Sequence, residues 1–231
     1  MKVFWSEVTV NASEAGFAIA LDGRPLRTPS KAALTVPTDA LAQGLALEWR
    51  EQTGAVRPET MPLTRAANTV IDRVIPHQAA VTAEIARYGE TDLLCYRAPD
   101  PAGLVARQKA AWDPLLDWAG EALGAPLHVT TGLMHCLQPA ESLEALRLAV
   151  EAHGPWQLAG LHDLVTLSGS LIIGLAVSHQ QTSAAKAWPL SRIDEDWNIE
   201  EWGEDAEAAE LASRKHRAFL DKERLLNLLR S

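Results

Sequence analysis

The chain has 231 residues, of which 47% are hydrophobic and 22% charged, and its formal net charge is −9. This length and composition are typical of one large or two small globular domains and argue against a disordered chain. Most of the excess negative charge lies after residue 100, and it disfavours nucleic acid as a partner because carboxylates repel phosphate backbones.

The sequence also indicates the compartment. Cys95 and Cys136 are the two cysteines, and they form no CxxC pair, which is typical of a reducing environment. The first residues have neither the apolar core of a signal peptide nor the Arg-rich composition of a transit peptide. The most apolar run, residues 164–177, is shorter than the ~20 residues that span a bilayer. We therefore expect a soluble cytoplasmic protein without membrane insertion.

The first 36 residues predict a small antiparallel sheet with strands near 4–10, 17–21, 24–29 and 33–36. Asp22-Gly23 is a strong hairpin signal, because glycine accepts the positive φ of such a turn. Thr38 or Asp39 then caps a helix that runs to Trp49, and Thr64 is expected to cap a second helix.

From Pro76 onward the apolar spacing predicts long helices, with a brief strand near 127–130. Asp113-Pro114 indicates a break or a new first turn within one of them. Residues 157–180 are apolar on nearly every side, so this helix is expected at the centre. The helices are predicted over 77–96, 103–123, 139–153, 157–180, 183–202 and 205–229. The predicted fold class is α+β, with a β-rich domain over 1–75 and an all-helical domain over 76–231.

The segment Trp188–Glu210 is the strongest candidate for a binding surface. Between Asp194 and Glu210 it has nine carboxylates and no Lys or Arg, yet Trp197 and Trp202 lie among them. Tryptophan side chains anchor protein contacts, and carboxylates select the partner. The predicted partner-binding residues are Asp194, Glu195, Asp196, Trp197, Glu200, Glu201 and Trp202.

Two alternatives for this segment remain open. The carboxylates are equally typical of a solvated helix face. Trp197 lies at helical spacing from Ile193, so it is alternatively a core residue that holds the acids outward.

No motif predicts catalysis, a cofactor or a metal. The chain has no phosphate-binding glycine loop, no GxSxG nucleophile elbow and no HExxH metal motif. His162, Asp163 and Ser168 are close in sequence, but His162 and Ser168 are six positions apart and so lie on different faces of a helix. We expect no catalytic residue and no metal ligand.

A second set of polar residues has two interpretations. Its members pair with each other where the two domains join, or they line the site of an enzyme of unknown class in the cleft between the domains. The residues are Arg65, Asn68, Asp92, Arg97 and Asp113.

Several segments, in order along almost the whole chain, carry a resemblance to a known family. They are LDGRPLRTP (21–29), LTVPT (34–38), EW (48–49), MPLTRAANTVID (61–72), TDLLCYRA (91–98), Gln108 with WDPLLDW (112–118), and the acidic segment ending in Trp202-Gly203. The chain resembles the assembly factors that chaperone the alpha subunit of the F-type ATP synthase.

The resemblance implies a β-containing domain followed by a helical domain, and a function without enzymatic turnover. A member of this family binds the newly made alpha subunit and keeps it from aggregating until it joins the beta subunit. The resemblance also places a critical acidic residue within Asp194–Asp196. We expect the free protein to be a monomer, since no heptad seam is present. A scaffold inside a permanent complex is a further alternative.

Overall fold

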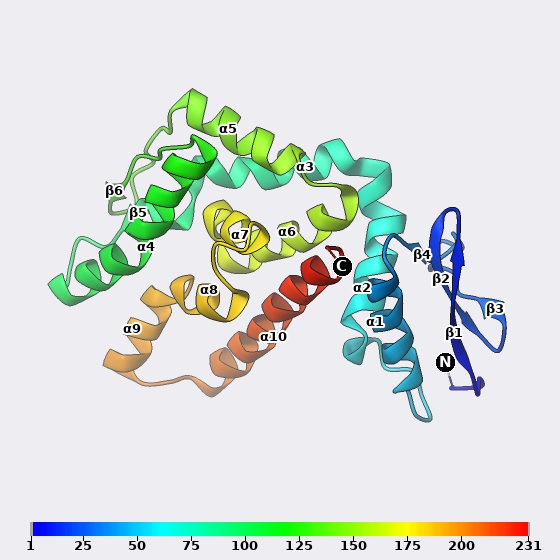
Figure 1. Ribbon diagram of the computed structural model, residues 1–231. Helices are drawn as coiled ribbons and strands as arrows, with labels where there is room; N and C mark the ends of the chain where they lie inside the picture. Colours follow the sequence, from blue (N-terminus) through cyan, green and yellow to red (C-terminus); the bar gives the residue numbers. More distant parts are fainter. Residues whose placement is uncertain (1, 231) are drawn as a thin grey trace. The chain divides into compact units, whose positions relative to one another are not determined.

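The structure, a computed structural model, describes residues 2–230 and begins with the predicted antiparallel sheet. The long hairpin β1–β2 is in register from Val8↔Leu21 to Ser13↔Gly16, and both β3 and β4 pair with β2 (Figure 1). The strands are β1 (Val8–Ser13), β2 (Gly16–Leu21), β3 (Arg24–Pro25) and β4 (Thr35–Val36).

The hairpin between β2 and β3 turns at Asp22-Gly23, as predicted. Their φ angles are 48° and 76°, the positive values that a two-residue hairpin turn requires. The Asp22 carboxylate also accepts hydrogen bonds from the backbone N–H groups of Ser6 (3.0 Å) and Glu7 (2.8 Å). These bonds lower the pKa of Asp22 and tie the turn to the chain that enters β1.

Helix α1 (Asp39–Arg50) packs on the sheet and begins where the sequence predicts. The Thr38 hydroxyl accepts a hydrogen bond from the Leu41 backbone N–H at 3.2 Å and so caps the first turn. Side chains of the sheet, α1 and α2 (Pro62–Thr69) share one apolar core. Each fully buried leucine or isoleucine in it contributes about 1.5–3 kcal/mol to stability. This core includes Ile19, Leu34, Leu41, Leu45, Met61, Leu63 and Leu225.

The predicted start of the second helix is wrong. Helix α2 begins at Pro62, and Thr64 lies inside it instead of capping it. The cap is tertiary: both carboxylate oxygens of the buried Glu48 on α1 accept hydrogen bonds from the backbone N–H groups of Leu63 (2.7 Å) and Thr64 (2.8 Å). Burial raises the pKa of Glu48, and these donors oppose the shift.

The chain forms two compact units. Unit 1 contains the residues up to Gln78, the segment Pro155–Gly160 and the residues from Arg224, and unit 2 contains Ala79–Gly154 and Leu161–Glu223. Unit 1 thus includes two segments from late in the sequence besides the predicted β-rich region.

Unit 2 is almost entirely helical, which agrees with the predicted fold class, but several of its helices are shorter than predicted or divided in two. The helix predicted over 77–96 ends at Ala86, and short helical turns lead from there to β5 (Tyr96–Arg97), which pairs in parallel with β6 (Thr130–Thr131). Pro114 does not break its helix, which ends at Gly124 with a φ of 66°. The helices that lie wholly or partly in unit 2 are α3 (Gln78–Ala86), α4 (Ala102–Leu123), α5 (Ala140–Glu151), α6 (Pro155–Ser168), α7 (Leu171–Ser178), α8 (Ala184–Leu190), α9 (Ile193–Trp202) and α10 (Ala206–Leu228).

Short helical turns occur in both units, and one of them, η2 (Val70–Val74), is π-helical and follows α2 in unit 1. The others are η1 (Pro58–Thr60), η3 (Ile75–His77), η4 (Arg87–Thr91) and η5 (Leu93–Cys95).

Helix α7 is the central element of unit 2, since all eight of its residues are buried. The single helix predicted over 157–180 is wrong, however. Gly169 has a φ of 71°, which ends α6, and the Ser170 hydroxyl caps α7 by accepting a hydrogen bond from the Ile173 backbone N–H at 3.0 Å. A second break, at Ser191-Arg192, separates α8 from α9. No helix within residues 2–230 is long and apolar enough to cross a membrane.

Candidate partner-binding surface

The seven predicted partner-binding residues all lie on α9, which starts at the buried Ile193. Three carboxylates, Asp194, Glu195 and Asp196, occupy its first turn. Negative charge there is favourable, because the helix dipole places partial positive charge at this end. The Arg192 guanidinium reaches Asp196 at 3.4 Å, one turn along the helix. Part of the acidic run therefore stabilises the helix, because three of its carboxylates lie in the first turn.

Two of the seven side chains are held by polar groups of α4. The Asp194 carboxylate accepts a hydrogen bond from the Gln108 amide at 2.6 Å. The Arg107 guanidinium donates one hydrogen bond to each oxygen of Glu200, both at 2.8 Å. This two-point contact lowers the pKa of Glu200 and raises that of Arg107. Asp194 and Glu200 therefore fix α9 in position.

Trp197 is the third anchor. Its ring lies 4.9 Å from the Arg107 guanidinium carbon and against the backbone of Gly103 on α4. A Cβ atom at position 103 would come within 2.7 Å of the Trp197 ring, so a glycine is needed there. This arrangement corresponds to the alternative in which Trp197 packs inward, but two of the acids, Asp194 and Glu200, also contact α4.

Four of the seven residues are exposed to solvent on α9, and one of them, Glu200, is held by Arg107. Trp202 is 86% exposed, and Glu195 and Glu201 are also exposed. The helix ends directly after Trp202, at Gly203, whose φ is 91°. A large exposed aromatic side chain on a helix that also exposes carboxylates is a feature common at protein interaction surfaces. We name Glu195, Glu201 and Trp202 the α9 surface.

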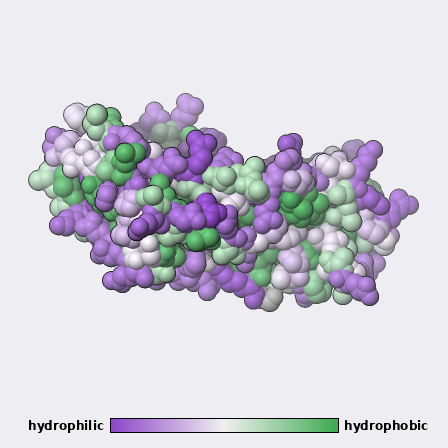
Figure 2. Space-filling model, turned by 90° about the horizontal axis from the view of Figure 1, so that it is seen from above, coloured by the Kyte–Doolittle hydropathy of each residue, from purple (hydrophilic) through white to green (hydrophobic). Residues whose placement is uncertain are grey.

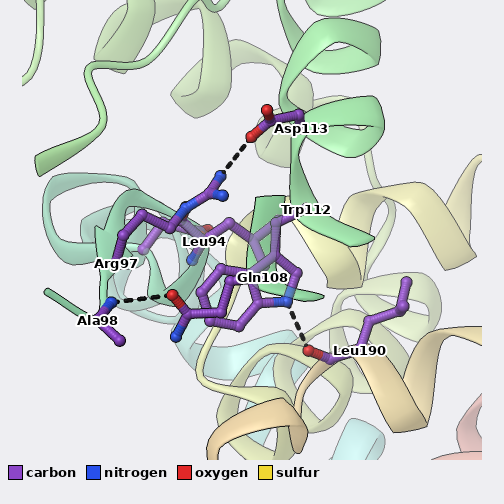
Figure 3. Close-up of polar contacts among 8 residues, drawn as sticks. Leu94, Arg97, Ala98, Gln108, Trp112, Asp113 and Leu190 are labelled. Carbon is purple, nitrogen blue, oxygen red and sulfur yellow. Dashed lines mark hydrogen bonds and ion pairs between the residues drawn. The ribbon is translucent and has the colours of Figure 1, made fainter. Parts of the chain in front are cut away.

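Arg97 and Asp113 of the second polar set pair with each other inside unit 2 (Figure 3). The Arg97 guanidinium donates to Asp113 at 2.9 Å and to the Leu94 carbonyl at 2.9 Å, and it lies 5.1 Å from the Trp112 ring centroid. The Trp112 indole N–H in turn donates to the Leu190 carbonyl at 2.7 Å. These contacts join β5, α4 and α8.

Asp92 belongs to a separate, fully buried cluster of unit 2. Its carboxylate accepts hydrogen bonds from the Leu94 backbone N–H (3.0 Å), the Ser170 hydroxyl (2.7 Å) and the Ile172 backbone N–H (3.0 Å). Burial raises the pKa of Asp92, and these donors act against the shift. The carboxylate therefore caps η5 and α7 together.

Arg65 and Asn68 are on α2, in unit 1. The Arg65 side chain is exposed, and the amide oxygen of Asn68 is buried without a hydrogen-bond partner among residues 2–230. The structure thus brings Arg97 and Asp113 together, places Asp92 in another cluster of the same unit, and assigns Arg65 and Asn68 to the other unit. The pairing of all five residues stays a prediction.

The cysteines form no disulfide, and the described residues form no group of metal ligands. Both cysteines are free thiols, and burial raises the pKa of Cys95 to about 12, so its thiol is protonated at neutral pH. Within residues 2–230 no three side chains suited to a metal lie together.

Sequence reasoning missed Glu48, whose role depends on a helix start 15 residues away. It also missed Arg107, and it noted Gln108 without its partner, because the residues that these two side chains hold on α9 are far away in the sequence. A glutamate on the inward face of a helix, next to Trp49, is the signal that could have indicated Glu48.

Comparisons with known proteins agree with this fold. Residues 2–120 match the family of ATP12 chaperone proteins. The crystal structure of Atp12 from Paracoccus denitrificans superposes with a TM-score of 0.96 at 46% identity, covering 99% of this chain and 98% of that one. The Atu1473 protein from Agrobacterium tumefaciens superposes with a TM-score of 0.93 at 43% identity, covering 99% of this chain and 85% of that one. Mitochondrial atp12 from Schizosaccharomyces pombe is 26% identical over 220 residues, which are 90% of this chain and 76% of that protein.

These relatives define the class of the protein, which is a chaperone and not an enzyme. The match over residues 2–120 covers more than half of the chain, and the Paracoccus structure covers nearly all of it. The chain belongs to the ATP12 chaperone family. It is therefore a non-enzymatic chaperone of ATP synthase assembly, and the alternative of an enzyme in a domain cleft is wrong.

Proposed function

We propose that the protein binds the unassembled alpha subunit of the F-type ATP synthase and shields its exposed interface until the beta subunit takes its place. The observation that carries this proposal is the α9 surface, a nearly fully exposed tryptophan beside two exposed carboxylates on a helix anchored to α4. Membership of the ATP12 family supports a client from ATP synthase assembly.

The physical chemistry of the α9 surface suits a transient chaperone. An unassembled subunit exposes an apolar interface that is prone to aggregate. Carboxylates accelerate the encounter with a basic client surface, and one aromatic anchor supplies much of the contact energy. A small set of contacts gives moderate affinity, so the client can leave when its permanent partner arrives.

The anchored residues of α9 have a different role in this proposal. Asp194, Trp197 and Glu200 position the helix through α4 and act on the client indirectly. Glu195, Glu201 and Trp202 touch the client. Asp196, whose carboxylate lies near Arg192, completes the acidic face. The family resemblance implies one critical acidic residue within Asp194–Asp196. In this proposal that residue either positions α9 or contacts the client.

The location and oligomeric state also remain proposals. We infer a cytoplasmic protein in a bacterium, which two bacterial relatives and the free thiols of Cys95 and Cys136 support. We infer a monomer in the absence of client, which size-exclusion chromatography with light scattering would test.

Co-expression with the alpha subunit tests the function. Wild-type protein should keep the alpha subunit soluble and co-elute with it. The triple variant Glu195→Ala/Glu201→Ala/Trp202→Ala should stay folded by circular dichroism and bind the alpha subunit at least about tenfold more weakly. Raising the salt concentration should slow association of the wild type, because screening weakens the steering by carboxylates.

A matched control removes the same groups elsewhere. Glu51, Glu59 and Phe4 are exposed residues of unit 1, so Glu51→Ala/Glu59→Ala/Phe4→Ala loses two carboxylates and one aromatic ring. This variant should bind like the wild type. If the alpha subunit stays insoluble with wild-type protein, the proposed client is wrong. If both triple variants bind equally well, the α9 surface is not the binding site.

A further inference from the structure

The connection between β6 and α5 exposes three large apolar side chains within five residues. Leu133 is 98% exposed, Met134 80% and Leu137 79%. We name residues 132–137 the apolar loop. On the face shown in Figure 2, hydrophilic surface predominates and apolar areas are small and separated. Side chains of this size lose favourable burial when they face water, so a cluster of them indicates an interaction site.

The backbone of the apolar loop is tied down at both ends. The Gly132 N–H donates to the Arg97 carbonyl at 2.8 Å. The Gln138 amide makes two hydrogen bonds with the backbone of His128, at 2.7 Å and 3.0 Å. Between these ends, the Tyr96 hydroxyl lies 3.3 Å from a ring nitrogen of His135. The apolar side chains are therefore presented by an ordered loop, which reduces the entropy that binding would cost.

A groove of about 580 Å³ leads up to the loop, and Thr131, the residue before it, lines that groove. One wall is the row of α4 residues that includes Lys109, Asp117 and Glu121, spaced by four or eight residues so that they share one helix face. The other wall is the segment 126–131 with its exposed Val129. The groove thus has an apolar side and a side where two exposed carboxylates lie one turn apart.

We propose that the apolar loop and this groove form a second docking surface for the client, taking a segment with two or three large apolar side chains next to a lysine or arginine. The apolar side chains would cover Leu133, Met134 and Leu137, and the cation would lie between Asp117 and Glu121. This inference rests on the proposed function, because it takes the alpha subunit as the partner.

Charge decides between this occupant and the alternatives. Arg97 and Asp113 of the groove pair with each other, so its remaining charges are one cation, Lys109, and the two carboxylates Asp117 and Glu121. This excess of negative charge disfavours a second copy of the chain, whose net charge is −9, and a nucleic acid. A segment with a basic side chain complements both carboxylates.

Helix α4 connects the two surfaces within unit 2. Gly103, Arg107 and Gln108 hold α9, while Lys109 and Asp117 line the groove. Two modest contacts on one rigid helix bind a client together far more tightly than either does alone. The client can also be released in two steps, because it binds only weakly once one of the two contacts is lost.

Cys136 in the apolar loop provides a direct probe in the unmodified protein. Cys95 is buried and its raised pKa keeps it protonated, so iodoacetamide at neutral pH reacts with Cys136 in preference. Bound alpha subunit should slow alkylation of Cys136 several-fold, as measured by mass spectrometry of the peptide that contains it. Unchanged alkylation in a complex that co-elutes would overturn the inference.

Variants give a second measurement. Leu133→Ser/Met134→Ser/Leu137→Ser should bind the alpha subunit at least about tenfold more weakly, and Asp117→Lys/Glu121→Lys should weaken binding chiefly at low salt. The control Leu47→Ser/Ile75→Ser/Leu148→Ser changes three other exposed apolar residues and should bind like the wild type.

The outcomes separate this inference from the proposed function. If wild-type protein fails to bind the alpha subunit, the proposed function fails and the client named here fails with it. If wild-type protein binds but the loop variant binds equally well, the second surface alone is wrong. A wild-type dimer that becomes a monomer in the loop variant would assign the loop to self-association and overturn the inference.

Discussion

Replacing Asp92 tests whether this buried carboxylate is a structural cap or part of a functional site. Asp92→Asn keeps the volume of the side chain, and Asp92→Ala removes it. In the wild type, one oxygen accepts from the Leu94 N–H and the Ser170 hydroxyl, and the other accepts from the Ile172 N–H. Both substitutions should therefore destabilise unit 2 without touching the surface.

The size of each effect follows from the donors left unpaired. In Asp92→Asn the amide oxygen can still accept the hydrogen bonds that one carboxylate oxygen accepts in the wild type. The NH₂ group replaces the other oxygen and faces a backbone N–H, which then has no acceptor. One buried donor without an acceptor costs about 1–3 kcal/mol. Asp92→Ala leaves three donors without an acceptor, and we expect a loss of about 3–5 kcal/mol. That is a large share of the roughly 5–15 kcal/mol that holds a typical domain together.

The assay is urea denaturation followed by circular dichroism, combined with hydrogen exchange of the amides of α7. The expected order of stability is wild type, then Asp92→Asn, then Asp92→Ala, with faster exchange at Ile172 in both variants. Asp72→Asn is the control, since Asp72 also accepts from a hydroxyl and a backbone N–H but in unit 1. Its α7 amides should exchange as in the wild type.

Two results would refute this reasoning. The first is an Asp92→Asn variant within about 0.5 kcal/mol of the wild type, the range of ordinary surface substitutions. The second is an Asp92→Asn variant that keeps its stability but no longer binds the alpha subunit, which would place Asp92 in the binding site.

Two further predictions concern the anchoring of α9 and a charged cluster. Gly103→Ala should displace the Trp197 ring, increase hydrogen exchange in α9 and weaken binding of the alpha subunit, because the added Cβ lies 2.7 Å from that ring. His162 donates a hydrogen bond to the Asp163 carboxylate at 3.0 Å, and this contact raises the pKa of His162 above its usual 6.5. The stabilisation that His162 gains is therefore complete below pH 6.5 and disappears as the pH rises through its higher folded-state pKa. The melting temperature of His162→Gln should be lower than that of the wild type at pH 6, with a smaller gap at pH 9.

Each of these has a control on the same chain. Gly120 is on α4 too, but a Cβ there meets its nearest atom at 3.7 Å, so Gly120→Ala should leave α9 exchange unchanged. His77 is exposed in unit 1, so His77→Gln is the matched histidine substitution away from Asp163. Equal α9 exchange in the two alanine variants, or a His162→Gln gap that grows with pH, would contradict the predictions.

Local signals in the sequence predicted the parts of the fold that depend on a few adjacent residues. Asp22-Gly23 fixes a hairpin and Gly124 a helix end, because each needs a positive φ that the residue type allows. The Thr38 cap is equally local. The α+β class followed from these signals and from the change of apolar spacing after Pro76.

The helix breaks were not predictable in the same way. Gly169-Ser170 lies in an apolar run whose spacing continues on both sides, so periodicity alone joins α6 to α7. Pro114 was expected to interrupt α4, but its side chain is exposed and the helix absorbs the lost hydrogen bond. The start of α2 depends on Glu48, which no local rule connects to Pro62.

The acidic segment shows the same limit at the candidate site. Composition identified the helix that carries the surface, but not which side chains are already bound. Gln108 and Arg107 are 86 and 93 residues away from Asp194 and Glu200. A pairing over that distance leaves no periodic trace in one sequence, so only the fold separates anchoring acids from exposed ones.

The membership of unit 1 has a consequence for how the protein is made. Leu225 packs in the same core as residues of the sheet, α1 and α2, and the Thr38 hydroxyl donates to the Leu228 carbonyl at 2.6 Å, across 190 residues of chain. This core cannot close while residues 224–230 are still being synthesised. Until these residues have been made, the N-terminal sheet, α1 and α2 lack part of their apolar cover, so unit 1 depends on contacts between distant parts of the chain.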